Sequence, residues 1–138
     1  MTNMQAAIGL SRIDKLDEIR ALRKKQMDIY YNAISNVNGI SLRKYTNWCD
    51  PVHWLMTISL DGKYDRYDFL LFMKNKGIDC RQMINPVHKA AHFINLYDGE
   101  FTVATNISKQ SVHLPSGAAL SKEIRNYIVK TIRNYLGN

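Results

Sequence analysis

The chain has 138 residues, of which 46% are hydrophobic, and it carries a formal charge of +7 at pH 7. This length and composition predict one globular domain over residues 1–138 and exclude a disordered chain. No apolar run approaches the roughly 18 residues that a membrane span requires, and the start shows no signal-peptide pattern. We therefore expect a cytoplasmic protein that has no membrane partner.

The cysteines and the basic residues narrow the function classes further. Cys49 and Cys80 are far apart and form no CxxC pair, so we expect reduced thiols that are buried or partly buried. The densest basic cluster, Arg23 to Lys25, falls on the polar side of a predicted helix. Such a cluster is typical of a solvated helix face, and we expect no nucleic acid as a partner. A basic balance also suits an enzyme whose substrates carry a diphosphate.

Residues 2–34 have the pattern of one long amphipathic helix. Thr2 and Gln5 have the spacing of a capping box, and apolar residues recur every three to five positions up to Ile34. Such a helix is about 48 Å long at roughly 1.5 Å per residue. A compact chain of this size has a radius of gyration of only about 14 Å. We therefore expect residues 1–35 to project from a small domain formed by residues 40–138, with the first turns needing a partner.

The rest of the chain predicts a small sheet and several helices. Alternating apolar residues predict a strand over 52–60, and shorter strands are predicted over 78–83 and 111–114. Caps and apolar stripes predict helices over the following ranges: 65–75, 101–109, and 121 onward, with a short helical turn over 89–93. The fold class is α/β, more narrowly a two-layer α+β domain with a mainly antiparallel three-stranded sheet covered by helices.

Three stretches in this order resemble one protein family. They are Met1 to Leu10 followed by Leu16-Asp17, then Gly77-Ile78-Asp79-Cys80-Arg81 leading through Asn85-Pro86-Val87-His88, and finally Ser111 to Pro115. Together they resemble signatures of the DegT/StrS family of pyridoxal-phosphate-dependent sugar-nucleotide aminotransferases, which includes perosamine synthetases. The resemblance implies the C-terminal, small domain of fold-type I transferases, in which the first helix runs from a large cofactor domain into the small domain.

The resemblance also implies a function. The full enzyme would transfer an amino group from an amino acid such as glutamate to a nucleotide-linked keto sugar, in polysaccharide or O-antigen biosynthesis. In the family the Schiff-base lysine lies upstream of the segment that resembles the start of this chain. We therefore expect no catalytic residue here, no pyridoxal phosphate bound by this chain alone, an N-terminal cofactor domain as the missing partner, and a homodimer. A sister branch of the family performs dehydration instead, and this choice stays open.

The second stretch supplies the candidate site. On chemical grounds Arg81 offers a bidentate bond to a phosphate or carboxylate, and His88 offers a donor to a sugar hydroxyl or phosphate. The alternatives are a surface ion pair for Arg81 and a hydrogen-bonded structural histidine for His88. The resemblance implies that Arg81, Asn85 and His88 bind the nucleotide-sugar substrate. The family often has an aromatic residue at or near Ile84 or Asn85, and this chain has none there.

Other residues are more simply read as structural. His88 and His92 are four apart, but no third ligand is evident, so we expect no metal site. Trp54 in the predicted strand and Tyr30 and Tyr31 in the first helix are expected to pack in the core. Two alternative functions remain open: a non-catalytic module that self-associates through the exposed stripe of the first helix, and, as the weaker one, nucleic-acid binding.

Overall fold

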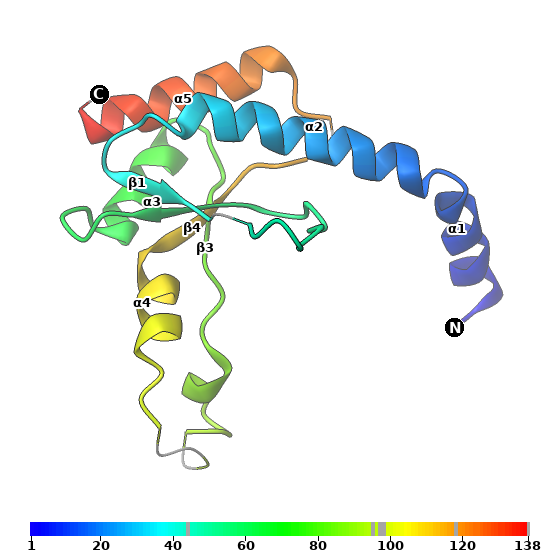
Figure 1. Cartoon of the computed structure of the whole chain (residues 1–138), viewed down its shortest axis with the longest axis horizontal. Helices are drawn as coiled ribbons and strands as arrows, with labels where there is room; N and C mark the ends of the chain where they lie inside the picture. Colours follow the sequence, from blue (N-terminus) through cyan, green and yellow to red (C-terminus); the bar gives the residue numbers. More distant parts are fainter. Residues whose placement is uncertain (44, 95, 97–98, 118, 138) are drawn as a thin grey trace.

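The computed structural model describes residues 1–43, 45–94, 96, 99–117 and 119–137. In chain order the elements are α1 (Asn3–Ile13), α2 (Leu16–Ile34), β1 (Ile40–Leu42), β2 (Met56–Leu60), α3 (Arg66–Asn75), β3 (Arg81–Gln82), the 3-10 helix η1 (Val87–Lys89), α4 (Thr102–Gln110), β4 (Ser111–Leu114) and α5 (Lys122–Leu136). The helices α2 and α5 lie side by side on one face of the sheet, α4 lies on the other side, and α1 extends away from the domain (Figure 1).

The sheet has four strands in the order β1-β2-β4-β3, and all neighbouring pairs are antiparallel. The predicted α/β class with a mainly antiparallel sheet covered by helices is therefore confirmed, while the predicted number of three strands is wrong. The missed strand is β1, which has only three residues and directly follows Gly39 at a φ of 91°. Three residues are too few to show the alternating pattern by which a strand is recognised in sequence.

The core forms between the helical layer and one face of the sheet. Tyr30 and Ile34 of α2 are each 1% exposed, and Ile58 of β2 and Ile132 of α5 are fully buried. The hydroxyl of Tyr30 donates a hydrogen bond of 2.9 Å to the carbonyl oxygen of Pro115, which satisfies the polar end of a buried ring. Burial raises the pKa of Tyr30 above its usual value. The predicted packing role of Tyr30 is thus confirmed.

The prediction of one continuous helix over residues 2–34 is wrong. The helix ends at Ile13 and a second one begins at Leu16, with Lys15 at φ −108° and ψ 10° between them. Asp14 is a poor residue for a helix interior, and Asp17 and Glu18 stand in the first turn of α2, where the helix dipole favours acids. The capping box predicted at Thr2 and Gln5 is present.

The strand predicted over residues 52–60 is too long, because β2 begins only at Met56. Trp54, which was expected in the core, is 64% exposed, and Val52 is 75% exposed. The segment before Met56 has no strand to pair with, since β1 ends at Leu42 and β4 ends at Leu114, the partners of Ile58 and Met56. It lies against α2 instead, where Arg20 pairs with Asp50 at 3.0 Å.

The second half of the chain follows the sequence prediction more closely. The Asp65 side chain caps α3 and the Ser121 side chain caps α5, and β4 has the predicted bounds. The strand predicted over 78–83 is present only at Arg81–Gln82. The helical turn predicted over 89–93 lies earlier in the structure, as η1 at Val87–Lys89.

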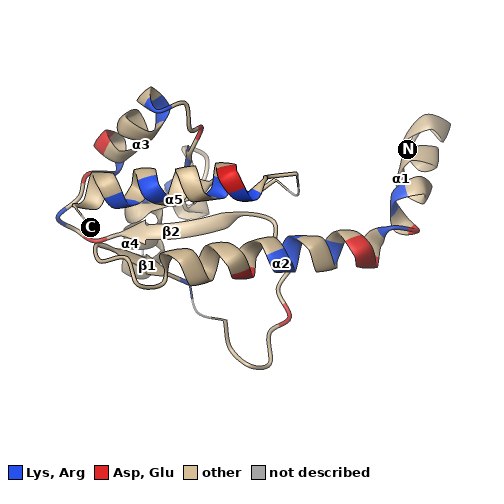
Figure 2. Cartoon of the chain, turned by 90° about the horizontal axis from the view of Figure 1, so that it is seen from above, with Lys and Arg blue, Asp and Glu red and all other residues tan. Residues whose placement is uncertain are grey.

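Two further properties of the helices are their charge distribution and their length. Lysines and arginines are distributed along both α2 and α5, and acidic residues lie between them (Figure 2). Within the described residues, no helix has the length and the apolar composition needed to cross a membrane.

Two matched isoleucine substitutions test this division between core and exposed helix. We expect Ile58→Ala to lower the free energy of unfolding by about 2–5 kcal/mol, because it opens a cavity in the core. Ile8→Ala on α1 should change it by less than about 0.5 kcal/mol, since Ile8 is 59% exposed. Urea unfolding of the two variants measures both values. A loss of stability in Ile8→Ala as large as that in Ile58→Ala would mean that α1 is covered in solution.

Candidate functional site

Arg81 lies at the edge of the sheet, in β3, and its side chain is 76% exposed. Its Nε and Nη2 atoms both donate to Oδ2 of Asp79, at 3.1 and 2.8 Å. This hydrogen bonding and the charge of Asp79 raise the pKa of Arg81 above its ordinary value. The arrangement is the surface ion pair that the sequence left open as the alternative. Because both partners are exposed, the guanidinium remains accessible to an anionic ligand.

His88 lies in η1 and is half-buried. Its ring stacks on Phe101 with 4.6 Å between ring centres and an interplanar angle of 29°. Its Nε2 atom is 3.4 Å from the hydroxyl oxygen of Thr105 on α4. These contacts hold the imidazole in one orientation against α4, so the structural role considered for His88 and a binding role for its remaining edge are compatible.

Asn85 is exposed and lies between these two residues in the chain. The neighbouring carbonyl of Ile84 accepts a hydrogen bond of 3.1 Å from Ser108, which ties this segment to α4. In Figure 1 the segment descends from β3 at the sheet to η1 near the lower end of the molecule. Arg81 and His88 therefore lie at opposite ends of one extended segment and do not form a single compact site within this chain.

The sheet places a further polar residue beside Arg81 that the sequence analysis did not single out. His113 on β4 lies directly opposite Arg81 on one side and Thr57 on the other, so all three belong to the same face. Its Nδ1 atom is 2.9 Å from the Thr57 hydroxyl, and its buried Nε2 atom has no hydrogen-bond partner among the described residues. The alternation of Ser111 and His113 with Val112 and Leu114 was the signal that could have identified this polar face.

The Cys80 thiol is a poor nucleophile. Cys49 and Cys80 are free and partly buried, as predicted. Burial, and to a smaller extent the negative charge of Asp79, raises the pKa of Cys80 to about 12. A thiol with such a pKa is almost fully protonated at neutral pH and is unreactive.

The described residues contain no cluster of metal ligands, and their lysines are open to solvent. No group of three His, Cys, Asp or Glu side chains that could hold a metal ion occurs among them. A pyridoxal phosphate site needs a lysine held against the cofactor, a carboxylate on its ring nitrogen and a cup for its phosphate. Every lysine in the described ranges is exposed, so none of them is enclosed as a Schiff-base lysine within this chain.

Comparisons with known proteins identify the family of the chain. A family model described as the DegT/DnrJ/EryC1/StrS aminotransferase family matches residues 1–133. The chain belongs to this family. The resemblance noted in the sequence is thereby confirmed.

Two similar relatives and one solved structure show how much of a family member the chain represents. It is 26% identical to GDP-perosamine synthase of Vibrio cholerae and 25% identical to that of Escherichia coli O157:H7, over 98% of this chain in each case and 37% and 36% of the relative. The crystal structure of DesV from S. venezuelae in complex with a ketimine intermediate superimposes with a TM-score of 0.86 at 23% identity, covering 98% of this chain and 36% of that chain. The chain thus spans about a third of the length of these family members.

The buried imidazole predicts a pH dependence of stability. Burial lowers the pKa of His113 below 6.5, so the unfolded chain takes up the proton more readily than the folded chain. The free energy of unfolding therefore has its full value above pH 6.5, where His113 is neutral in both states. It decreases as the pH falls through the lowered pKa of His113 in the folded state. We expect His113→Gln to reduce the loss of stability between pH 7.5 and 5.5, as measured by urea midpoints. His92→Gln, at an exposed position, is the control and should keep the slope.

Proposed function

We propose that this chain forms the small domain of a pyridoxal-phosphate-dependent sugar-nucleotide aminotransferase in the cytoplasm. The complete enzyme transfers an amino group from an amino acid such as glutamate to a nucleotide-linked keto sugar. Family membership and the similarity to GDP-perosamine synthases support this assignment. The match to about a third of each relative supports a role for this chain as one part of such an enzyme.

The observation that carries the proposal is the lack of cover over α1. No residue of α1 is buried, and apolar side chains are exposed along it: Met4, Ile8, Leu10 and Ile13. The helix carries a single charge, on Arg12, so it is not a solvated polar helix. An exposed apolar helix surface marks an interaction site. We assign its partner as a cofactor domain, which supplies pyridoxal phosphate and the lysine that no described residue of this chain provides.

In this enzyme Arg81, Asn85 and His88 contact the nucleotide sugar. Arg81 is suited to this role because its exposed guanidinium exchanges Asp79 for a phosphate oxygen at little cost. His88 is suited because the stacked Phe101 fixes its ring. Since Arg81 and His88 are spread along one extended segment, the substrate lies along the segment and not in a pocket of this chain.

The test starts from the coding sequence upstream of Met1. We expect it to encode, in frame, a Schiff-base lysine and an Asn-x-Arg before Met1, and the enzyme made from both parts should form the Schiff-base absorption band and aminate a nucleotide-linked keto sugar. In that enzyme Arg81→Gln should raise the KM for the nucleotide sugar about tenfold, the cost of one charge-assisted bond, with little change in kcat. Lys74→Gln, at an exposed position on α3, is the matched control.

Two results would overturn the proposal. One is an upstream sequence with neither feature. The other is a purified 138-residue chain that forms the Schiff-base band and turns over substrate without any added part. Equal KM values for Arg81→Gln and Lys74→Gln would remove Arg81 from the substrate site while leaving the domain assignment intact.

The same exposed helix favours a second candidate, a non-catalytic module that pairs with a second copy through α1. Under this alternative the chain sediments as a dimer, and Ile8→Glu converts it to a monomer, because a buried carboxylate has no partner there. Under the small-domain proposal the isolated chain has no tight self-partner, and Ile8→Glu leaves its mass unchanged. Sedimentation equilibrium from micromolar to near-millimolar concentrations distinguishes the two candidates.

A further inference from the structure

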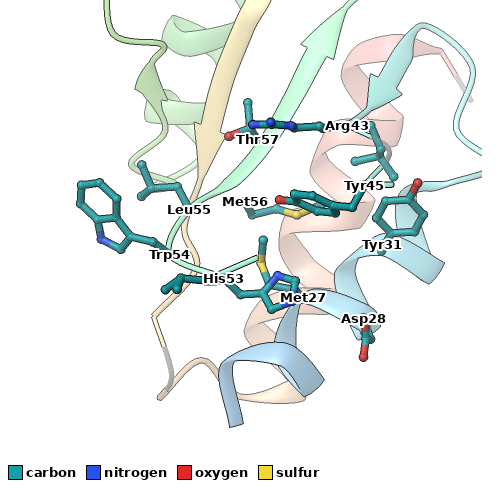
Figure 3. A pocket seen from close by; sticks show the side chains of 12 residues that line it. Met27, Asp28, Tyr31, Arg43, Tyr45, His53, Trp54, Leu55, Met56 and Thr57 are labelled. Carbon is teal, nitrogen blue, oxygen red and sulfur yellow. The ribbon is translucent and has the colours of Figure 1, made fainter. Parts of the chain in front are cut away.

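A cleft of about 470 Å³ lies between α2 and the segment that leads into β2 (Figure 3). Its walls carry flat rings from separate parts of the chain, namely Tyr31 of α2, and Tyr45 and His53 of the segment before β2. Trp54 also lines the cleft, but its indole points away from these rings (Figure 3). Tyr45 meets His53 edge to face, with 6.0 Å between ring centres. The buried side chains of Met27 and Met56 also line the cleft. Its volume falls within the range of small-molecule sites.

Among the described residues, two groups at this cleft lack a partner of the usual kind: a ring nitrogen without a hydrogen bond and a guanidinium without a carboxylate. The Nδ1 atom of His53 is buried and makes no hydrogen bond among the described residues. Buried polar atoms are nearly always paired, so this one requires an explanation. The guanidinium of Arg43 lies 5.5 Å from the ring centre of Tyr45, and within the described ranges no carboxylate forms an ion pair with it. A cation held over an aromatic face without a counter-ion is suited to bind an anion.

The charges also orient a ligand. Arg43 lies at the upper end of the cleft in Figure 3, near Thr57, whereas Asp28 lies at the lower end with its carboxylate directed outward. An anionic group is attracted to the Arg43 end and repelled from the Asp28 end. The rings and His53 lie between these two ends, where an uncharged flat group fits.

We propose that this cleft binds a flat aromatic ring that carries an anionic group. The ring packs against the tyrosine rings, a polar ring atom bonds to Nδ1 of His53, and the anion pairs with Arg43. The lining contains none of Arg81, Asn85 and His88, so the site is separate from the substrate segment proposed above and stands whether or not that function holds. Nucleotides and aromatic carboxylates both have this chemistry, and binding measurements distinguish them.

Tryptophan fluorescence provides the readout, because the chain has only two tryptophans. Trp48 is 86% exposed and does not line the cleft, so Trp48→Phe leaves Trp54 as the only reporter. Guanosine 5′-monophosphate should change this fluorescence with a saturable curve. Guanosine, which lacks the anion, and inorganic phosphate, which lacks the ring, should each bind at least about tenfold more weakly, in line with the loss of one charge-assisted bond or of the stacked ring.

Variants on the same background locate the binding. Arg43→Gln should weaken binding of the nucleotide about tenfold, and His53→Phe, which keeps a ring but removes Nδ1, should weaken it as well. Arg12→Gln on α1 removes the same charge away from the cleft and should leave binding unchanged. Circular dichroism spectra that match the parent chain establish that the variants are folded.

A comparison with benzoate shows which class of ligand the cleft prefers. Tighter binding of the nucleotide assigns the cleft to nucleotides, and tighter binding of benzoate assigns it to aromatic carboxylates. The proposal fails if neither ligand gives a saturable curve up to millimolar concentrations. It also fails if Arg43→Gln binds as well as Arg12→Gln, or if inorganic phosphate alone binds as tightly as the nucleotide.

Discussion

The apolar face of the sheet must be shielded from water, and α2 and α5 shield it. Met56, Ile58 and Leu60 alternate along β2, Val112 and Leu114 continue the same face on β4, and all five are at most 3% exposed. The buried residues of α2 that cover them, Met27, Tyr30 and Ile34, all belong to its C-terminal half. This packing fixes the direction of α2, so its N-terminal half and α1 are carried beyond the sheet (Figure 1).

Polar contacts also hold α2 and α5 in position relative to each other. Arg125 of α5 is only 8% exposed, and it donates to the side-chain oxygen of Gln26 on α2 and to the carbonyl oxygen of Leu120. A buried charge is costly unless hydrogen bonds compensate it, so these bonds specify how α2, α5 and the segment before α5 fit together. Tyr30 adds the bond to Pro115 in the same segment.

The sequence predicted what depends on local pattern and missed what depends on distant partners. Caps at Thr2, Asp65 and Ser121 are local features, and they were predicted correctly. The start of β2 at Met56 depends on where its partner strands β1 and β4 stop, and no local sequence pattern shows this. The family motifs located Arg81, Asn85 and His88, but the pairing of Arg81 with Asp79 and its position opposite His113 follow only from the register of β3 on β4.

The segment before β2 forms one wall of the aromatic cleft, and contacts with α2 hold this segment. The segment before β2 has no strand partner, and the described contacts that hold it on α2 include the ion pair of Arg20 with Asp50 and the bond from Arg23 to the carbonyl oxygen of Trp54. An exposed ion pair contributes only about 0.2–1 kcal/mol, so the ion pair alone does not fix the position of the segment. The α2 residues that line the cleft, Met27, Asp28 and Tyr31, lie further along the helix than Arg20 and Arg23. Both anchors therefore lie in the N-terminal half of α2, which extends beyond the sheet towards α1, and the cleft lies on its C-terminal half.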